Sequence, residues 1–176
     1  MLKNCNYLNW LILIFVSCSE LTEIESLPID NIPDQESWEA IIILTNKGKM
    51  RAKIQSGHLE KYNEKSHILL DTNVTVDFFD QDERHTSILT SDAAEIDQNT
   101  NNMKARGNVV AISDSGITLF SEILYWDSQK EKLYTEANIM ITTLDKDTLF
   151  GTGFESNSNL KNWKILNPSG VSGIVY

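Results

Sequence analysis

Apolar and polar residues alternate along most of the chain after Trp38, and this alternation restricts the possible fold more than any other feature. The side chains of a β-strand point in turn to its two faces, so strict alternation predicts strands with one apolar face. β-Branched residues are abundant in these stretches, and glycine, asparagine, aspartate or serine separates them. No segment carries a sustained apolar stripe at the helical period. The sequence therefore predicts an all-β domain.

The alternating stretches have the lengths of single strands, and the turns between them are short enough to form hairpins. Consecutive strands are therefore expected to be antiparallel. The expected strands are Ala40–Thr45, Met50–Tyr62, Ser66–Phe79, Thr86–Asp97, Asn102–Ser113, Ile117–Trp126, Lys132–Thr143, Thr148–Glu155 and Trp163–Leu166.

Part of the sequence repeats with an offset of 30 residues, which aligns Ser91 with Ser121. At this offset Ile96-Asp97 coincides with Trp126-Asp127, and Asn108 with Asn138. Each unit contains a strand, an aspartate-bearing turn, a second strand and another turn. One such unit cannot bury its own apolar face, so neighbouring units must stack. The expected product is an elongated, layered β structure.

The period of two also predicts which residues share a face. Stacked strands would join their apolar rows into one continuous lining. The same rows could instead form the filled core of a β-sandwich. For most of these residues the filled core is the favoured interpretation. The rows are Ile68, Leu70, Thr72, Val74, Val76 and Phe78; Met103, Ala105, Gly107, Val109 and Ala111; and Leu133, Thr135, Ala137, Ile139 and Ile141.

The N-terminus has the pattern of a secretory signal. Lys3 precedes an apolar run from Tyr7 to Val16, which is far shorter than the ~20 residues that a membrane-spanning helix needs. Ser17-Cys18 resembles a bacterial lipobox, in which the cysteine is acylated and becomes the mature N-terminus. Residues 1–17 are thus predicted to be a lipoprotein signal peptide, 18–36 a flexible tether and 37–176 the folded domain. An ordinary signal with a stray cysteine and a short uncleaved anchor are the alternatives.

Cysteine usage and charge exclude several classes of protein. Cys5 and Cys18 are the two cysteines, so the mature domain has no disulfide framework. The net charge of −10 argues against nucleic-acid binding, which needs a basic face. An acidic surface remains compatible with lipid binding through apolar contacts and with docking on a basic protein.

No motif predicts catalysis, a cofactor or a metal. His58, His67 and His85 lie on separate expected strands, without metal-ligand spacing. The serines lack a partnered histidine in the context of a nucleophile elbow, and no glycine-rich loop opens a helix. A glycan-cleaving enzyme would need a carboxylate pair in a cleft, whereas most acids here fall on turns and on outward rows. The chain is therefore expected not to be an enzyme.

Several stretches together resemble the LptC family, the periplasmic component of the lipopolysaccharide export system, within the OstA-like β-jellyroll superfamily. They are LTSDAAEID, GNVV, LFSEILYWD and the Gly151-x-Gly153-Phe154-Glu155 stretch with Trp163 after it. The resemblance covers roughly Glu36 to the C-terminus. It implies an elongated twisted β-jellyroll, boat-shaped, with stacked antiparallel strands and an apolar groove. Relatives with a single membrane span differ at the N-terminus from this chain, with its predicted lipidated Cys18.

The resemblance also implies a function and partners. The groove would bind acyl chains of lipopolysaccharide, received from an inner-membrane ABC transporter and passed to a periplasmic bridge protein of the same fold, which docks through edge strands. The chain would be lipid-anchored at the periplasmic face of the inner membrane. An adaptor that assembles partners through its edges without carrying lipid is the alternative. The expected groove residues are Val74, Val76, Phe78, Val109, Ala111, Leu119, Ile123, Ile139, Ile141 and Phe154.

Overall fold

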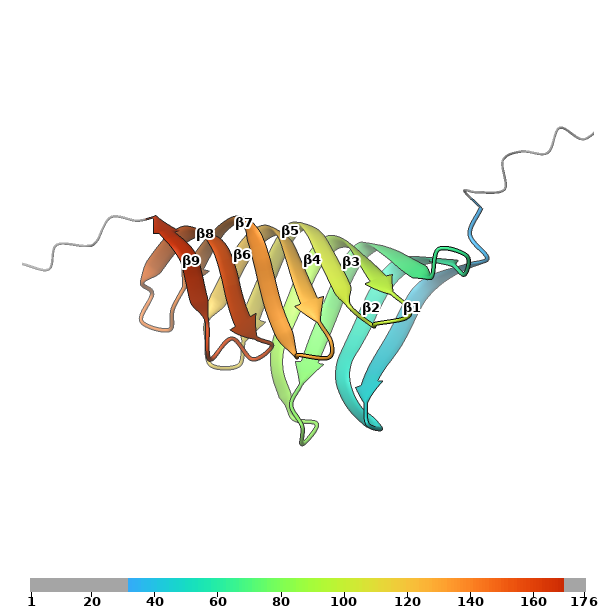
Figure 1. The fold of residues 1–176 in the computed structure, drawn as a ribbon, viewed down its shortest axis with the longest axis horizontal. Helices are drawn as coiled ribbons and strands as arrows, with labels where there is room; N and C mark the ends of the chain where they lie inside the picture. The colour runs from blue at the N-terminus through green and yellow to red at the C-terminus, as the bar shows by residue number, and fades with distance from the viewer. Residues whose placement is uncertain (1–31, 170–176) are drawn as a thin grey trace, which may run out of the picture. The chain divides into compact units, whose positions relative to one another are not determined.

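A computed structural model of the chain describes residues 32–169, which form one antiparallel sheet of nine strands (Figure 1). The strands lie side by side in sequence order, as expected for hairpin connections, and the all-β prediction is confirmed. No helix in this part of the chain is long and apolar enough to cross a membrane. The strands are β1 (Gln35–Asn46), β2 (Lys49–Tyr62), β3 (His67–Phe79), β4 (His85–Asp97), β5 (Met103–Ser113), β6 (Thr118–Asp127), β7 (Lys132–Thr142), β8 (Thr148–Asn157) and β9 (Lys164–Ser169).

Strand β1 begins at Gln35, earlier than the expected Ala40, because Ser37 pairs with Leu59 and Trp38 with His58. Ladder pairing thus extends a strand into residues whose own pattern is polar. The predicted signal peptide, Cys18 and most of the predicted tether lie outside the described residues.

The repeated aspartates close turns, as the repeat predicts. Asp97 Oδ1 accepts hydrogen bonds from the backbone N–H groups of Asn99 (2.8 Å) and Thr100 (2.9 Å). Asp127 Oδ1 does the same with Gln129 (3.1 Å) and Lys130 (2.9 Å). Aspartate side chains stabilise turns in this way by replacing a backbone acceptor. The N–H donors of Thr100 and Asn99 also hold the pKa of Asp97 below its ordinary value.

A line of β-bulges crosses the sheet and bends the strands. The ladders from β2–β3 to β7–β8 each shift register near mid-strand, for example between Thr90 and Ala93 and between Arg106 and Val109. Ser91 Oγ donates to the carbonyl of Ala93 (3.0 Å) within this bend. Asn108 has a φ of 47°, a left-handed conformation that asparagine tolerates well.

The sequence repeat therefore marks the bend as well as the turns. Ser121, the counterpart of Ser91, donates through Oγ to the carbonyl of Ile123 (2.9 Å). Asn108 and Asn138 likewise lie at bulges, on β5 and β7. A bulge re-aims the side chains that follow it, so the bulges at these serines and asparagines change which residues of each strand are buried beyond the bend.

The bend folds the sheet so that its apolar face lies inside on both sides of the bulge line. The rings of Phe78, from one side, and Trp126, from the other, meet edge to face at a centroid distance of 5.4 Å. Ser87 Oγ donates to the carbonyl of Ser158 (2.5 Å), which joins β4 to the turn after β8. Together with the bends, these contacts produce the twisted jellyroll expected for the domain.

Candidate functional site

The expected groove residues lie on the inner face of the folded sheet, with one exception. Nine of the ten are at most 4% exposed. Ile123 is half-buried on the outer side, and Leu124 takes the inner position with 0% exposure. The bulge at Ser121 causes this difference because it shifts the side-chain alternation of β6. The lipid contact expected of these residues stays a prediction.

The inner residues form rows that run across the sheet in register. In one row Val76 pairs with Leu89, Leu89 with Ala111, and Ala111 with Leu119. Leu119 continues the row to Ile141 on β7. Ile54, Leu89 and Leu124 are buried on the same inner face, each at most 1% exposed, although they are not among the residues expected from the sequence. Alternation alone identifies the first two, whereas Leu124 requires knowledge of the bulge.

The inner row is buried as far as Ile141 on β7 and becomes exposed on β8. Leu149, on β8, pairs with Ile141 in the inner row but is 40% exposed. Arg51 on β2 forms an ion pair through Nε with Oε1 of Glu131, in the turn between β6 and β7, at 2.9 Å. This ion pair borders a small hollow of about 180 Å³ lined partly by Leu44, Arg51 and Trp126. The inner face thus offers apolar packing, and an apolar guest needs no more than this.

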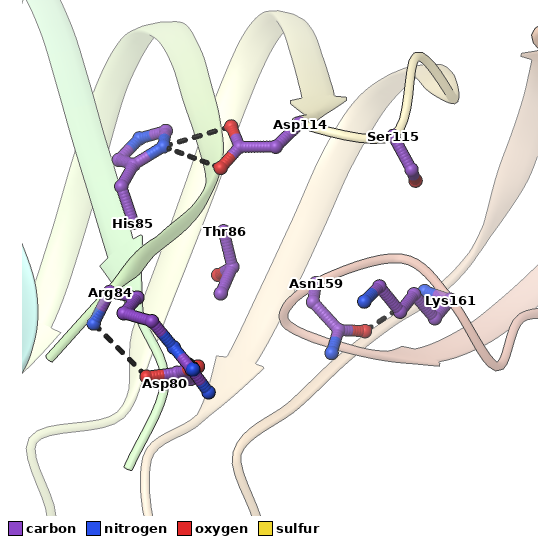
Figure 2. Close-up of a pocket in the computed structure, with 8 residues that line it drawn as sticks. All are labelled: Asp80, Arg84, His85, Thr86, Asp114, Ser115, Asn159 and Lys161. Atoms are coloured by element: carbon purple, nitrogen blue, oxygen red, sulfur yellow. Dashed lines mark hydrogen bonds and ion pairs between the residues drawn. The ribbon is translucent and has the colours of Figure 1, made fainter. Parts of the chain in front are cut away.

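A polar hollow of about 490 Å³ lies beside β4 (Figure 2). His85 Nδ1 hydrogen-bonds to both oxygens of Asp114, at 2.9 and 3.1 Å. Arg84 forms ion pairs with Asp80 at 3.0 Å and Asp82 at 2.9 Å. The backbone N–H of Arg84 is the main reason why the pKa of Asp80 lies below its ordinary value. These contacts are exposed ion pairs, a type that contributes little to stability.

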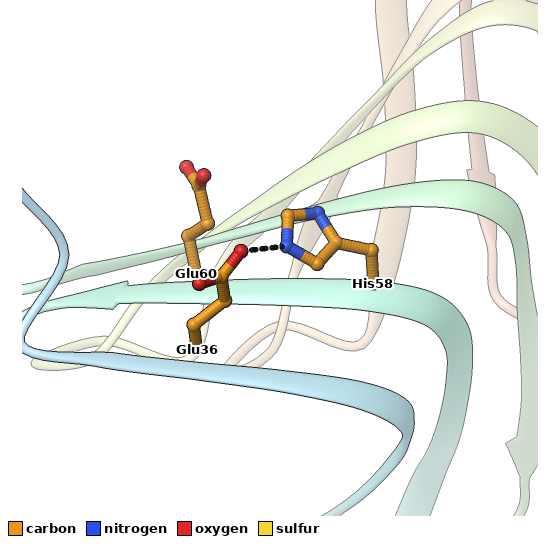
Figure 3. Close-up of side chains that lie close together, drawn as sticks. All are labelled: Glu36, His58 and Glu60. Atoms are coloured by element: carbon orange, nitrogen blue, oxygen red, sulfur yellow. Dashed lines mark hydrogen bonds and ion pairs between the residues drawn. The ribbon is translucent and has the colours of Figure 1, made fainter.

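A second polar cluster lies where β1 pairs with β2 (Figure 3). His58 on β2 hydrogen-bonds through Nε2 to Glu36 Oε1 on β1 (2.9 Å) and through Nδ1 to Asp71 Oδ2 on β3 (3.2 Å). A ring that donates from both nitrogens is protonated, and the bond to Glu36, followed by that to Asp71, raises the pKa of His58.

The same cluster includes Glu60, which accepts a hydrogen bond from the Tyr62 hydroxyl at 2.9 Å. Glu36, His58 and Glu60 each offer one ligand atom, and these atoms lie within 4.8 Å of one another, a spacing that could hold a metal ion. The sequence did not predict this grouping because the three residues come from two paired strands. The hydrogen bonds of His58 make the cluster an ionic clamp across β1, β2 and β3.

The two ends of the sheet, β1 and β9, each have a neighbouring strand on one side only. Such edges present unpaired N–H and C=O groups and can accept a strand from another protein. Gly151 and Gly153 seat β9 closely on β8: a Cβ on Gly151 would lie 2.7 Å from the Asn167 carbonyl oxygen, and Gly153 has a φ of 79°. A glycine inside a strand often marks a bend or a close backbone approach of this kind.

Comparisons with known proteins agree with this architecture. The family model described as "Lipopolysaccharide-assembly, LptC-related" matches residues 40–171, which is most of the chain and most of the sheet. A search of curated proteins finds no match. The family acts in lipopolysaccharide transport, as a periplasmic component associated with the inner membrane. The chain belongs to the LptC family of the lipopolysaccharide export system.

Proposed function

We propose that this protein receives lipopolysaccharide from an inner-membrane ABC transporter and passes it to a periplasmic bridge protein of the same fold. The apolar inner rows would hold the acyl chains, and β1 and β9 would add to the edge strands of the two neighbours. The observation that carries the proposal is the in-register apolar row that crosses the sheet and is exposed at Leu149. Lipidation at Cys18 would keep the domain at the periplasmic face of the inner membrane.

The packed interior sets a condition on this proposal. Val76, Val109 and Ile139 are at most 4% exposed, so an acyl chain can enter only where the two sides of the bend separate. The ion pair between Arg51 and Glu131 and the ring contact between Phe78 and Trp126 join those sides. Loading would therefore replace protein packing with lipid packing of similar apolar character, which lets the lipid both bind and leave.

Site-specific photo-crosslinking in cells tests the lipid path. A photoreactive residue at Val76, Val109 or Ile139 should capture lipopolysaccharide, because these positions face inward. Asp77 and Glu136 are matched controls on the outward rows of β3 and β7. Capture from the control positions alone would overturn the inner-face path.

The second candidate function is an adaptor that joins envelope partners through β1 and β9 without carrying lipid. The closed core favours this function, since the inner rows already bury one another. A disulfide that locks the two sides of the bend, made between cysteines introduced at Ser87 and Ser158, distinguishes the two. Lipid transfer should stop when the disulfide forms and resume on reduction, whereas an adaptor should work equally well in both states.

A further inference from the structure

The outer face of the sheet carries an apolar row of its own. Val110 on β5 pairs with Phe120 on β6, Phe120 with Met140 on β7, and Met140 with Phe150 on β8. Directly opposed side chains on one face of an antiparallel sheet contact one another. The four residues therefore form a continuous outer strip, and Phe150 is 48% exposed. On β3 and β4 the same row continues as Thr75 and Thr90, so the apolar character is confined to one region.

The outer strip borders a hollow of about 430 Å³ at the line of bulges. All four residues of the strip line it, and Val109 and Ile139 line it as well. Asn108, Ser121 and Asn138 supply its polar rim. Apolar side chains with a few polar groups around them are the usual composition of a binding hollow. The hollow thus combines an apolar wall with a polar border at the line of bulges, where it also touches two buried residues of the inner rows, Val109 and Ile139.

The charges around the hollow are mainly negative. Glu122 lines it and is exposed. Asp92 and Glu136 are exposed on the same line of bulges, and Asp92 Oδ2 accepts a hydrogen bond from Asn108 Nδ2 at 2.8 Å. Arg106 is the basic residue beside them on β5, so acids outnumber bases here, as they do in the whole chain with its net charge of −10.

This charge selects among possible occupants. Anionic lipid headgroups and a second copy of this acidic chain would both be repelled by the rim. A protein segment with apolar side chains flanked by lysine or arginine would be attracted, and its apolar residues would fill the hollow. We propose that the outer strip and its hollow are a docking site for such a basic, apolar segment of a partner protein. This site does not include the edge strands β1 and β9, and of its lining residues Val109 and Ile139 belong to the inner rows.

Photo-crosslinking with mapping of the captured peptide tests the proposal in the full-length chain in its native cells. A benzoylphenylalanine in place of Phe120 should crosslink to one segment of another protein, and mass spectrometry should show apolar residues flanked by lysine or arginine. The matched control is the same photoreactive residue at Thr75, on the same row but outside the apolar region. It should not capture that segment.

Charge reversal completes the test. Glu122→Lys should lower the crosslinking yield about tenfold, because rim charges govern encounter between complementary surfaces, and Glu122→Gln should lower it less. Glu155→Lys, an exposed acid on β8 beyond the bend, changes the net charge equally and should leave the yield unchanged. Capture of lipid, of a second copy or of an acidic segment would overturn the proposal. An absence of capture, or a yield insensitive to Glu122→Lys, would overturn it as well.

Discussion

The two edges of the sheet differ in length, in apolar content and in the way they are held. Strand β1 has 12 residues and exposes Trp38 (68%), Ile41 (59%) and Ile43 (57%) on its outer side, while Ile42 and Leu44 face inward. Strand β9 has 6 residues and includes Pro168, which lacks an N–H for pairing. An edge strand that is apolar on both faces is a strong template for another strand.

This difference indicates that the two ends are not interchangeable. Strand β1 offers apolar side chains as well as a free backbone edge, and it is tied to the sheet by the His58 clamp. Strand β9 depends on the close approach that Gly151 and Gly153 permit. A transfer chain with a direction needs such an asymmetry, because each end must select a different neighbour.

The largest loss of stability is expected from a substitution at Gly151, where β9 packs closely on β8. Gly151→Val places side-chain atoms against Ile165 and the Asn167 carbonyl oxygen, so β9 must move away from β8. The free energy of unfolding should fall by about 2–3 kcal/mol, as for other overpacked sites. Denaturant unfolding and hydrogen exchange of the β9 amides measure this. The control Thr148→Val, at an exposed position of β8, should change stability by less than about 0.5 kcal/mol. If hydrogen exchange of the β9 amides is unchanged in Gly151→Val, the close contact at Gly151 does not hold β9 on β8.

The next effect concerns the choice of partner, and it rests on the proposed edge docking. Ile43→Lys should weaken binding of the partner that docks at β1, and Leu166→Lys binding of the partner that docks at β9, each about tenfold or about 1.4 kcal/mol. Both side chains are exposed, at 57% and 41%, so the fold should tolerate the change. Titrations of each variant with each purified partner compare the edges. If either substitution weakens both complexes equally, the edges do not select their partners separately.

The sequence predicts the strands, the turns and most of the inner face, because alternation and turn chemistry are local. It does not predict the bend, since Ser121 moves the buried position from Ile123 to Leu124 through a bulge that needs the neighbouring strand. It also leaves open whether the apolar rows form a groove or a closed core. The contact of Phe78 with Trp126 brings the two sides of the bend together at that point, and it joins residues far apart in the sequence.

Sequence alone also does not predict the candidate sites, because they form between paired strands. Glu36, His58 and Asp71 look unrelated in the sequence, yet pairing of β1 with β2 and of β2 with β3 places them together. The outer strip is likewise visible only once Val110, Phe120 and Phe150 are in register. Both features depend on pairing between strands, which alternation within a single strand does not specify.

The smallest expected effect is a pH dependence of the stability with which strand β1 is held on the sheet. The pKa of His58 lies above its ordinary value of 6.5, because Glu36 and then Asp71 accept hydrogen bonds from the ring. Stabilisation by the protonated His58 ring is therefore complete below about pH 6.5, and it is lost as the pH rises through the raised pKa. Strand β9 has no histidine, so its amides provide an internal reference.

Hydrogen exchange of the β1 amides, corrected for the intrinsic rate at each pH, measures this loss. Protection of β1 should decrease relative to β9 above the raised pKa. Glu36→Gln should lower the pKa of His58 toward its ordinary value, which NMR titration of the ring reports directly, and should shift the β1 transition to lower pH. Because Glu36 is exposed, the substitution should leave the other strands unchanged. A β1 transition that does not follow the His58 titration would show that the clamp does not hold the edge, and that β1 is retained by ladder pairing and inner packing alone.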